Sequence, residues 1–232
     1  MRLFTISNFI TLSNLLCGCL GSMAVLQDGD LKKGGLFIGL ALILDFFDGF
    51  VARLLKESSE LGKQLDSLAD VVSFGALPGF ILWALMSSSG YLPQNTAYLA
   101  FLIPVFSALR LAKFNIDTRQ SMSFIGVPTP ANAMVIAVFP YLAQSSPEIA
   151  DILLNSWFLP VYILIFAYLL VAEIPLPALK FKNYSWQDNQ FIYVLLILSV
   201  ILLALLKLAA VPLIIFGYIF YSIVQYLRNP RP

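Results

Sequence analysis

Residues 35–55 read GLFIGLALILDFFDGFVARLL, an apolar run with two aspartates, Asp45 and Asp48, near its middle. As an α-helix, a run of about 20 residues is long enough to cross the roughly 30 Å hydrocarbon core of a bilayer. A charged side chain near the centre of a bilayer costs a few kcal/mol, so such residues face a cavity or a partner rather than lipid. The run therefore predicts a membrane helix that carries part of a functional site.

The composition of the whole chain agrees with this prediction. The chain has 232 residues, of which 59% are hydrophobic and 12% are charged, whereas a soluble domain is about half apolar and a quarter charged. Its formal net charge is only +1, so no global field attracts a polyanion. These values exclude a nucleic-acid binder, a disordered chain and a disulfide-stapled secreted module. We expect an all-α polytopic membrane protein.

Eight apolar segments are predicted to form transmembrane helices. They cover residues 8–27, 35–55, 67–87, 95–112, 128–144, 152–175, 190–206 and 208–228. If the N-terminus is cytoplasmic, the inner side carries all of the 14 Lys and Arg residues except Lys32, Lys33 and Lys207. Because Lys and Arg are enriched in cytoplasmic loops, both termini are expected in the cytosol and the protein in the cytoplasmic membrane.

The available side chains limit the chemistry. The sequence contains no histidine, which excludes imidazole bases and His-ligated zinc. Its two cysteines, Cys17 and Cys19, are two residues apart on a predicted helix and point to different faces, so no disulfide is expected. An acid, a base or a metal ligand must therefore come from Asp, Glu, Lys, Tyr or backbone groups.

Carboxylates recur at helical spacing on two successive segments. On the first, one helix face holds Asp45, Asp48, Gly49, Ala52 and Arg53, and on the next, one face holds Gly62, Asp66, Asp70 and Ser73. The two helices are antiparallel and joined by a short cytosolic connection, so their acidic faces can meet near the cytosolic side.

Four converging carboxylates repel one another, and divalent cations remove this conflict. Hard oxygen ligands favour Mg²⁺, Mn²⁺ or Ca²⁺, and two such metals can clamp the attacking and leaving oxygens at phosphorus. Two other interpretations remain open on spacing alone. The acids could pair with Arg53, Arg110 or Lys113 to stabilise packing, or they could line an ion or proton pathway.

The run from Asp45 to Asp70 resembles the signature of the CDP-alcohol phosphotransferase family, D-x2-D-G-x2-A-R-x8-G-x3-D-x3-D, at every fixed position and in every gap. The resemblance implies an integral membrane enzyme that moves a substituted phosphoryl group from a CDP-linked lipid to an alcohol and releases CMP. It implies one domain over residues 1–232, with a six-helix catalytic core over about 6–175 and an extra helical hairpin over about 190–228.

The same resemblance implies roles for the residues of the signature. Asp45, Asp48, Asp66 and Asp70 would bind two divalent metals, Mg²⁺ or Mn²⁺, and Asp70 would also be the general base. The residues expected to bind the CDP-lipid are Gly49, Ala52, Arg53 and Gly62, together with Asn8 and Thr11 from the first segment.

The flanking sequence, over about residues 6–132, resembles the bacterial and archaeal phosphatidylserine synthases within that family. Residues 8–18 match N-x2-T-x2-N-L-x2-G, and residues 70–78 match D-x-V-S-F-G-x2-P. Residues 110–115 and 124–131 resemble R-x2-R-F-N and F-x-G-x-P-x-P-A. Two departures are Ser7 in place of a proline and Lys113 in place of an arginine. The serine pocket implied by these pieces contains Ser73, Arg110, Lys113, Asn115, Pro128 and Thr129.

The predicted reaction is transfer of the phosphatidyl group from CDP-diacylglycerol to the hydroxyl of L-serine, which gives phosphatidylserine and CMP. The expected partners are these substrates, membrane lipids and, by family resemblance, a second copy in a homodimer. One alternative keeps the chemistry but uses glycerol 3-phosphate, inositol phosphate or choline as the acceptor. Alternatives of other classes are an ion-coupled transporter and a structural membrane protein.

Overall fold

The computed structural model describes residues 3, 5–57, 59–88, 90, 93–117, 123–177 and 185–228, and most of them are helical. The first half contains α1 (Ile6–Leu26), α2 (Leu31–Leu54), a continuous helix of α3 (Glu60–Asp70), π-helical η1 (Val71–Ala76) and α4 (Leu77–Ser88), and then 3-10 helix η2 (Gln94–Phe101) and α5 (Leu102–Ile116). The second half contains α6 (Thr129–Ala143), α7 (Pro147–Leu153), α8 (Phe158–Val171), α9 (Trp186–Leu206), η3 (Lys207–Ala209) and α10 (Ala210–Arg228).

Polar caps set the starts of the first three helices. Thr5, Asp30 and Ser59 each accept a hydrogen bond from the backbone N–H three residues later, at 3.1, 2.9 and 3.0 Å. Such a cap satisfies one of the donors that a helix start leaves unpaired. The cap at Ser59 starts α3 at Glu60, ahead of the apolar segment predicted from residue 67. Asp66 therefore lies inside a formed helix, which fixes the direction of its side chain.

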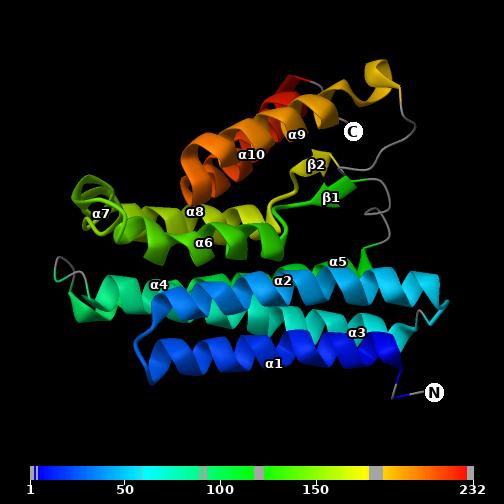
Figure 1. Ribbon diagram of the computed structural model, residues 1–232, viewed down its shortest axis with the longest axis horizontal. Helices are drawn as coiled ribbons and strands as arrows, with labels where there is room; N and C mark the ends of the chain where they lie inside the picture. Colours follow the sequence, from blue (N-terminus) through cyan, green and yellow to red (C-terminus); the bar gives the residue numbers. More distant parts are fainter. Residues whose placement is uncertain are drawn as a thin grey trace.

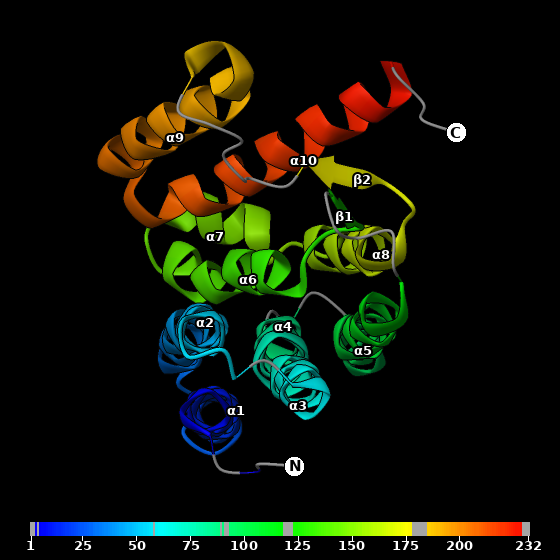
Figure 2. The same ribbon diagram turned by 90° about the vertical axis from the view of Figure 1, so that its right-hand side faces the viewer.

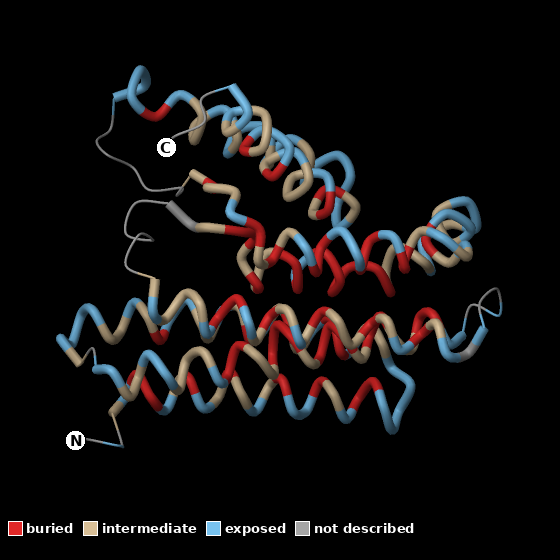
Figure 3. The backbone as a smooth tube through the Cα atoms, turned by 180° about the vertical axis from the view of Figure 1, so that it is seen from behind, coloured by how far each residue is buried: buried red, intermediate tan, exposed pale blue. Residues whose placement is uncertain are grey.

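The helices form three layers (Figures 1 and 2). Helices α1 to α5 lie roughly parallel in the first, α6 and α8 cover them, and the α9–α10 hairpin lies on the far side of α6 and α8. The buried residues gather where the first two layers meet (Figure 3). Phe74 of η1, Ile81 of α4, Ile136 of α6 and Ile163 of α8 are fully buried there. This packing places η1 among α1, α5 and α6.

The predicted membrane class is confirmed. By length and apolar composition, the described residues contain five helical runs able to cross a membrane, or six if α7 and α8, bent by 56°, form one span. Helix α6 has only 15 residues, which cover about 22 Å at the helical rise. The run Trp186–Arg228 is one of the five helical runs, although η3 divides it into α9 and α10. The number of eight spans and the side of the termini stay predictions.

One feature was not predicted from the sequence. Strands β1 (Ser123–Ile125) and β2 (Pro175–Pro177) pair antiparallel, with Ile125 opposite Pro175. After β1 the chain turns at Gly126, whose φ is +76°, and a Cβ there would lie 2.5 Å from the carbonyl oxygen of Leu170. Glycine is needed because other residues are strained at this φ. The ladder and the turn tie the start of α6 to the end of α8.

Candidate active site

Three carboxylates from two helices gather at one point. Asp45 and Asp48 lie one turn apart on α2, Asp66 lies on α3, and one oxygen from each lies within 4.8 Å of the others. Asp48 is 5% exposed. The connection between the two helices turns sharply at Lys56, whose φ is +54°. The two helices thus run back along each other, and their acidic faces meet.

Helix α1 forms a third wall of the acidic group. Thr11 Oγ1 donates a hydrogen bond of 2.6 Å to Asp48 Oδ2, and Ser7 Oγ donates one of 3.1 Å to the backbone oxygen of Asp48. Both contacts are buried. Thr11, predicted to bind the CDP-lipid, therefore also orients a carboxylate. Ser7, noticed in the sequence only as a departure from the family pattern, fixes the backbone of the same aspartate.

Asp70 lies one turn beyond Asp66 and is 7% exposed. It is not among the three acids that lie within 4.8 Å of one another. Asn14 Nδ2 donates to Asp70 Oδ1 at 3.4 Å, and Ser73 Oγ donates to the backbone oxygen of Asn14 at 3.0 Å. Asn14 was not among the predicted site residues. The available signal was its spacing, because Asn8, Thr11 and Asn14 recur every three residues along α1.

A cavity of about 260 Å³ opens beside the acids. Its lining contains Ser7, Asn8, Thr11, Asp48, Gly49, Ala52, Arg53, Glu57, Ser59, Gly62, Lys63 and Asp66. All six residues predicted to bind the CDP-lipid are in this set, whereas Ser7, Glu57, Ser59 and Lys63 were not predicted. A Cβ at Gly49 would meet nothing within 4 Å. The absence of a side chain at Gly49 therefore enlarges the cavity and does not serve close packing of a neighbouring helix.

The residues predicted for the serine pocket divide into two groups. Ser73, Arg110 and Thr129 are buried, at 0%, 6% and 0% exposed. Arg110 lies close enough to Asp70 for their charges to interact. Pro128 is the N-cap of α6 and precedes Thr129 in the helix. This group lies on the inner faces of η1, α5 and α6.

Lys113 and Asn115 form the second group, at the exposed end of α5. Lys113 forms a salt bridge with Glu173, in the connection after α8. Asn115 Nδ2 donates to Ser67 Oγ at 2.9 Å, and the backbone oxygen of Asn115 accepts from Lys63 Nζ at 3.0 Å. Both residues therefore brace α5 against its neighbours, and their role in a serine pocket stays a prediction.

A family model for CDP-alcohol phosphatidyltransferases matches residues 4–174, which include the acids, the cavity and α1. The chain belongs to the CDP-alcohol phosphatidyltransferase family. The family resemblance predicted from the sequence is thus confirmed. The match ends before the α9–α10 hairpin, which begins at Trp186.

Relatives of this CDP-alcohol phosphatidyltransferase include bacterial, archaeal and yeast proteins. It is 35% identical over 193 residues to a CDP-diacylglycerol–serine O-phosphatidyltransferase of Helicobacter pylori, with 81% of this chain and 76% of the relative covered. It is 30% identical over 229 residues to one of Methanocaldococcus jannaschii, covering 98% and 97%. It is also 32% identical over 152 residues to an archaetidylserine synthase of Methanothermobacter thermautotrophicus, covering 62% and 64%.

The residues present in this family member fit divalent metals. The family uses such metals, and the three gathered acids offer only hard oxygen ligands, which suit Mg²⁺ or Mn²⁺. Asp66 Oδ1 is buried and has no hydrogen-bond partner among the described residues. A buried carboxylate oxygen without a donor is costly, and a cation at this point would satisfy it.

Proposed function

We propose that this protein transfers the phosphatidyl group of CDP-diacylglycerol to the hydroxyl of L-serine, forming phosphatidylserine and CMP. The observation that carries the proposal is the meeting of three acids from α2 and α3 beside a cavity lined by the predicted CDP-lipid residues. The names of the relatives from Helicobacter pylori and Methanocaldococcus jannaschii support serine as the acceptor.

The cavity suits the cytidine diphosphate part of the lipid. Arg53 and Lys63 line it and supply positive charge for phosphate oxygens, while Gly49 and Ala52 leave space along the helix. Apolar residues on the outer faces of α1 and α2, such as Phe9 and Phe46, are 72% and 64% exposed. The acyl chains of the substrate can therefore remain in the bilayer while its headgroup enters the cavity.

Two divalent cations, held by Asp45, Asp48, Asp66 and Asp70, would neutralise the diphosphate and the departing phosphate. Thr11 and Ser7 hold Asp48 in place for this role. Such fixed charges supply much of the rate in phosphoryl transfer.

Asp70 is proposed as the general base. The serine hydroxyl oxygen attacks the β-phosphorus of the lipid while its proton passes to the Asp70 carboxylate. The bond from the β-phosphorus to the bridging oxygen breaks, and CMP leaves with that oxygen. The Asn14 amide, hydrogen-bonded to Asp70 Oδ1, would orient this carboxylate for the proton transfer.

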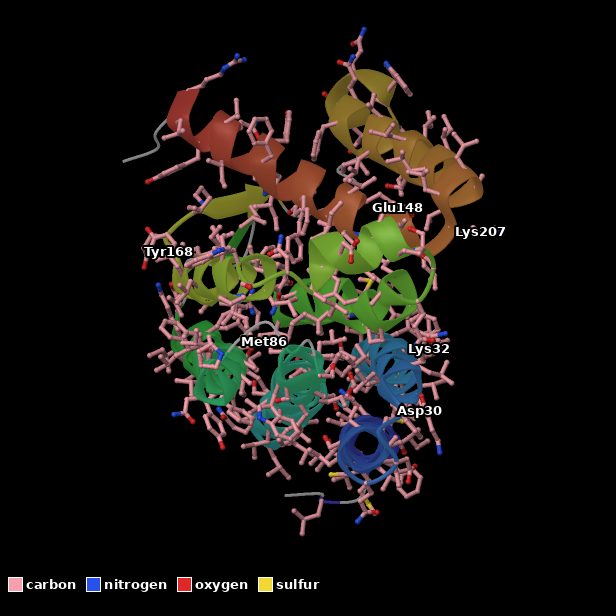
Figure 4. The ribbon with its side chains drawn as sticks, turned by 90° about the vertical axis from the view of Figure 1, so that its left-hand side faces the viewer. Asp30, Lys32, Met86, Glu148, Tyr168 and Lys207 are labelled. Carbon is pink, nitrogen blue, oxygen red and sulfur yellow. The ribbon has the colours of Figure 1, made fainter. Side chains whose placement is uncertain are left out.

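We propose that the protein lies in the cytoplasmic membrane with this site facing the cytosol. Arg53, Lys56 and Lys63 lie around the connection at the acidic end of α2 and α3. Lys32, in the first turn of α2, and Lys207, between α9 and α10, lie at the end of the molecule that faces the viewer in Figure 4, away from that connection (Figure 1). This asymmetry follows the positive-inside pattern. The homodimer stays a prediction, which light scattering of the detergent-solubilised protein would check.

The acceptor assay supplies purified protein with CDP-diacylglycerol, Mn²⁺ and radiolabelled serine, glycerol 3-phosphate or inositol phosphate in separate reactions. We expect label in lipid, with equimolar CMP, only from serine, and complete loss of activity with EDTA. Incorporation of glycerol 3-phosphate or inositol phosphate instead of serine would refute the choice of acceptor. Activity that resists chelation would refute the metal site.

The variant Asp70→Asn tests the base. Loss of a positioned general base lowers turnover by about 10²- to 10⁴-fold, while CDP-lipid binding should persist and Mn²⁺ should still bind through Asp45, Asp48 and Asp66. The matched control is Asp151→Asn, which changes an exposed aspartate on α7 and should leave turnover unchanged. Normal turnover in Asp70→Asn would contradict the assigned role.

A further inference from the structure

Four polar side chains lie buried on α5 and α6, beyond the acids and the cavity. Ser107, Arg110, Thr129 and Asn132 are 0%, 6%, 0% and 0% exposed. Each has a buried atom without a hydrogen-bond partner among the described residues: Ser107 Oγ, Arg110 Nε, Thr129 Oγ1 and Asn132 Nδ2. Buried polar groups in proteins are almost always paired. Four exceptions on two helices that pack around the same element require a ligand or ordered water.

The pair on α5 faces η1. Ser107 and Arg110 are three residues apart and share a helix face. A Cβ at Gly75 would lie 3.2 Å from Ser107 Cβ, so this face is turned toward η1. Arg110 is nearer the inner end of α5, where its charge interacts with that of Asp70. Arg110 therefore lies near the proposed base, and Ser107 lies one helical turn farther from it, beside Gly75 of η1.

The second pair, on α6, belongs to another helix that contacts η1. Thr129 and Asn132 are also three residues apart on one helix face, and α6 packs against η1 as α5 does. Asn132 Oδ1 accepts a hydrogen bond of 2.6 Å from the Tyr162 hydroxyl of α8. Because Tyr162 occupies the amide oxygen, the Nδ2 group of Asn132 remains available to donate to a ligand. Figure 2 shows α5, α6 and α8 arranged around the α3–α4 helix.

The composition of this group suits a zwitterion. Arg110 offers a permanent cation for a carboxylate, and the Ser107 hydroxyl and the Asn132 amide offer neutral donors. Asn14 Oδ1, on the other side of Asp70, is also buried and without a partner among the described residues. It can accept a hydrogen bond from an ammonium group. An amino acid whose hydroxyl faces Asp70 matches this arrangement of charges.

We propose that Ser107, Arg110, Thr129 and Asn132 form the pocket for the amino-acid acceptor, and that Arg110 and Asn132 together hold its α-carboxylate. Tyr162 is then a positioning residue, because it fixes the orientation of the Asn132 amide. The inference rests on the proposed function and deepens it. It adds Ser107 and Asn132 to the acceptor pocket and assigns Asn132, together with Arg110, to recognition of the carboxylate.

The test measures KM for serine and for CDP-diacylglycerol separately, with the full-length protein. Asn132→Leu removes the donor and keeps a similar volume. Since a hydrogen bond to a charged group is involved, we expect KM for serine to rise about tenfold or more, with KM for CDP-diacylglycerol unchanged. Ser107→Ala should act in the same direction. Its matched control is Ser222→Ala, which changes a serine that is equally buried but lies on α10.

Ethanolamine, which has the hydroxyl and ammonium groups but no carboxylate, distinguishes recognition from a structural effect. Asn132→Leu should lower kcat/KM for serine about tenfold and leave kcat/KM for ethanolamine unchanged. Tyr162→Phe should also lower kcat/KM for serine relative to kcat/KM for ethanolamine, to a smaller extent. Equal losses for serine and ethanolamine would overturn the proposal.

Folding is checked by gel filtration in detergent. If Asn132→Leu does not yield a monodisperse protein, Asn132→Ser and Ser107→Ala carry the test. A wild-type KM for serine in folded variants at both positions would mean that water alone satisfies these atoms, which also overturns the proposal. Failure of the proposed function is distinct, because the wild-type protein itself would then fail to incorporate serine.

Discussion

Replacing Thr11 with valine removes a hydroxyl from α1 while keeping a side chain of nearly the same shape. A hydroxyl carries one proton, and Thr11 Oγ1 lies 2.6 Å from Asp48 Oδ2 and 3.1 Å from the backbone oxygen of Ser7. The shorter contact to a charged acceptor is the stronger one. In Thr11→Val, Asp48 loses its only described side-chain donor, and its carboxylate is less firmly oriented.

The expected loss follows from the energy of this contact. A hydrogen bond to a charged group contributes about 1.5–3 kcal/mol, and each 1.4 kcal/mol corresponds to about a tenfold change in an equilibrium constant. Removing groups that orient metal ligands costs about 10- to 100-fold in metal affinity or activity. We therefore expect the Mn²⁺ concentration for half-maximal activity to rise by about 10- to 100-fold, with little change in KM for serine.

The assay titrates Mn²⁺ into a chelator-treated protein and follows CMP release. Two controls separate the metal effect from packing. Thr11→Ser keeps the hydroxyl and should retain most of the affinity for Mn²⁺. Ser13→Ala removes a hydroxyl from the same helix, one that donates to the Phe9 carbonyl at 2.9 Å and is exposed, and should change nothing.

An unchanged Mn²⁺ titration in folded Thr11→Val would refute the reasoning. It would mean that Asp48 keeps its orientation without α1, or that Asp48 is not a ligand. A parallel weakening in Ser13→Ala would point to a general disturbance of α1.

Two glycines should respond in opposite ways to the same substitution. Gly18→Val should lower the free energy of unfolding by about 1–3 kcal/mol, seen as a lower Tm in detergent, because a Cβ there would lie 2.6 Å from Ser73 Oγ and 2.9 Å from Ser73 Cα. Gly49→Val should leave Tm unchanged, because a Cβ there meets nothing within 4 Å. It should instead raise KM for CDP-diacylglycerol, on the order of tenfold, by filling the cavity. A fall in Tm for Gly49→Val, or none for Gly18→Val, would contradict the packing described.

The acidic group was accessible from the sequence because its geometry is mostly local. Residues three and four apart share a helix face in any α-helix, so the spacing of Asp45 and Asp48 predicts their alignment without a tertiary structure. A short connection between two apolar segments then requires antiparallel helices, which brings Asp66 to the same place. The residues lining the cavity follow from the same faces.

The contributions of distant segments were less accessible. Thr11 and Asn14 reach carboxylates 37 and 56 residues away in sequence, and no local rule specifies which face of α1 turns toward α2 and α3. Lys113 was predicted in the serine pocket as a cation near the site, but the fold provides it with Glu173, 60 residues away. The β1–β2 ladder likewise depends on two connections that the packing of α6 and α8 brings together.

The sequence by itself determined that this protein lies in a bilayer and that its site is built from aligned acids. Long apolar runs require helices in a bilayer, since a helix satisfies its own backbone hydrogen bonds, and helical spacing aligns the acids. Only the tertiary structure decided which side chains complete the site. The hydrogen bonds from α1 to the acids, and the burial of polar side chains on α5 and α6, exist because whole helices pack at one depth and rotation. That choice depends on the summed packing of small residues such as Gly18 and Gly75 against their neighbours.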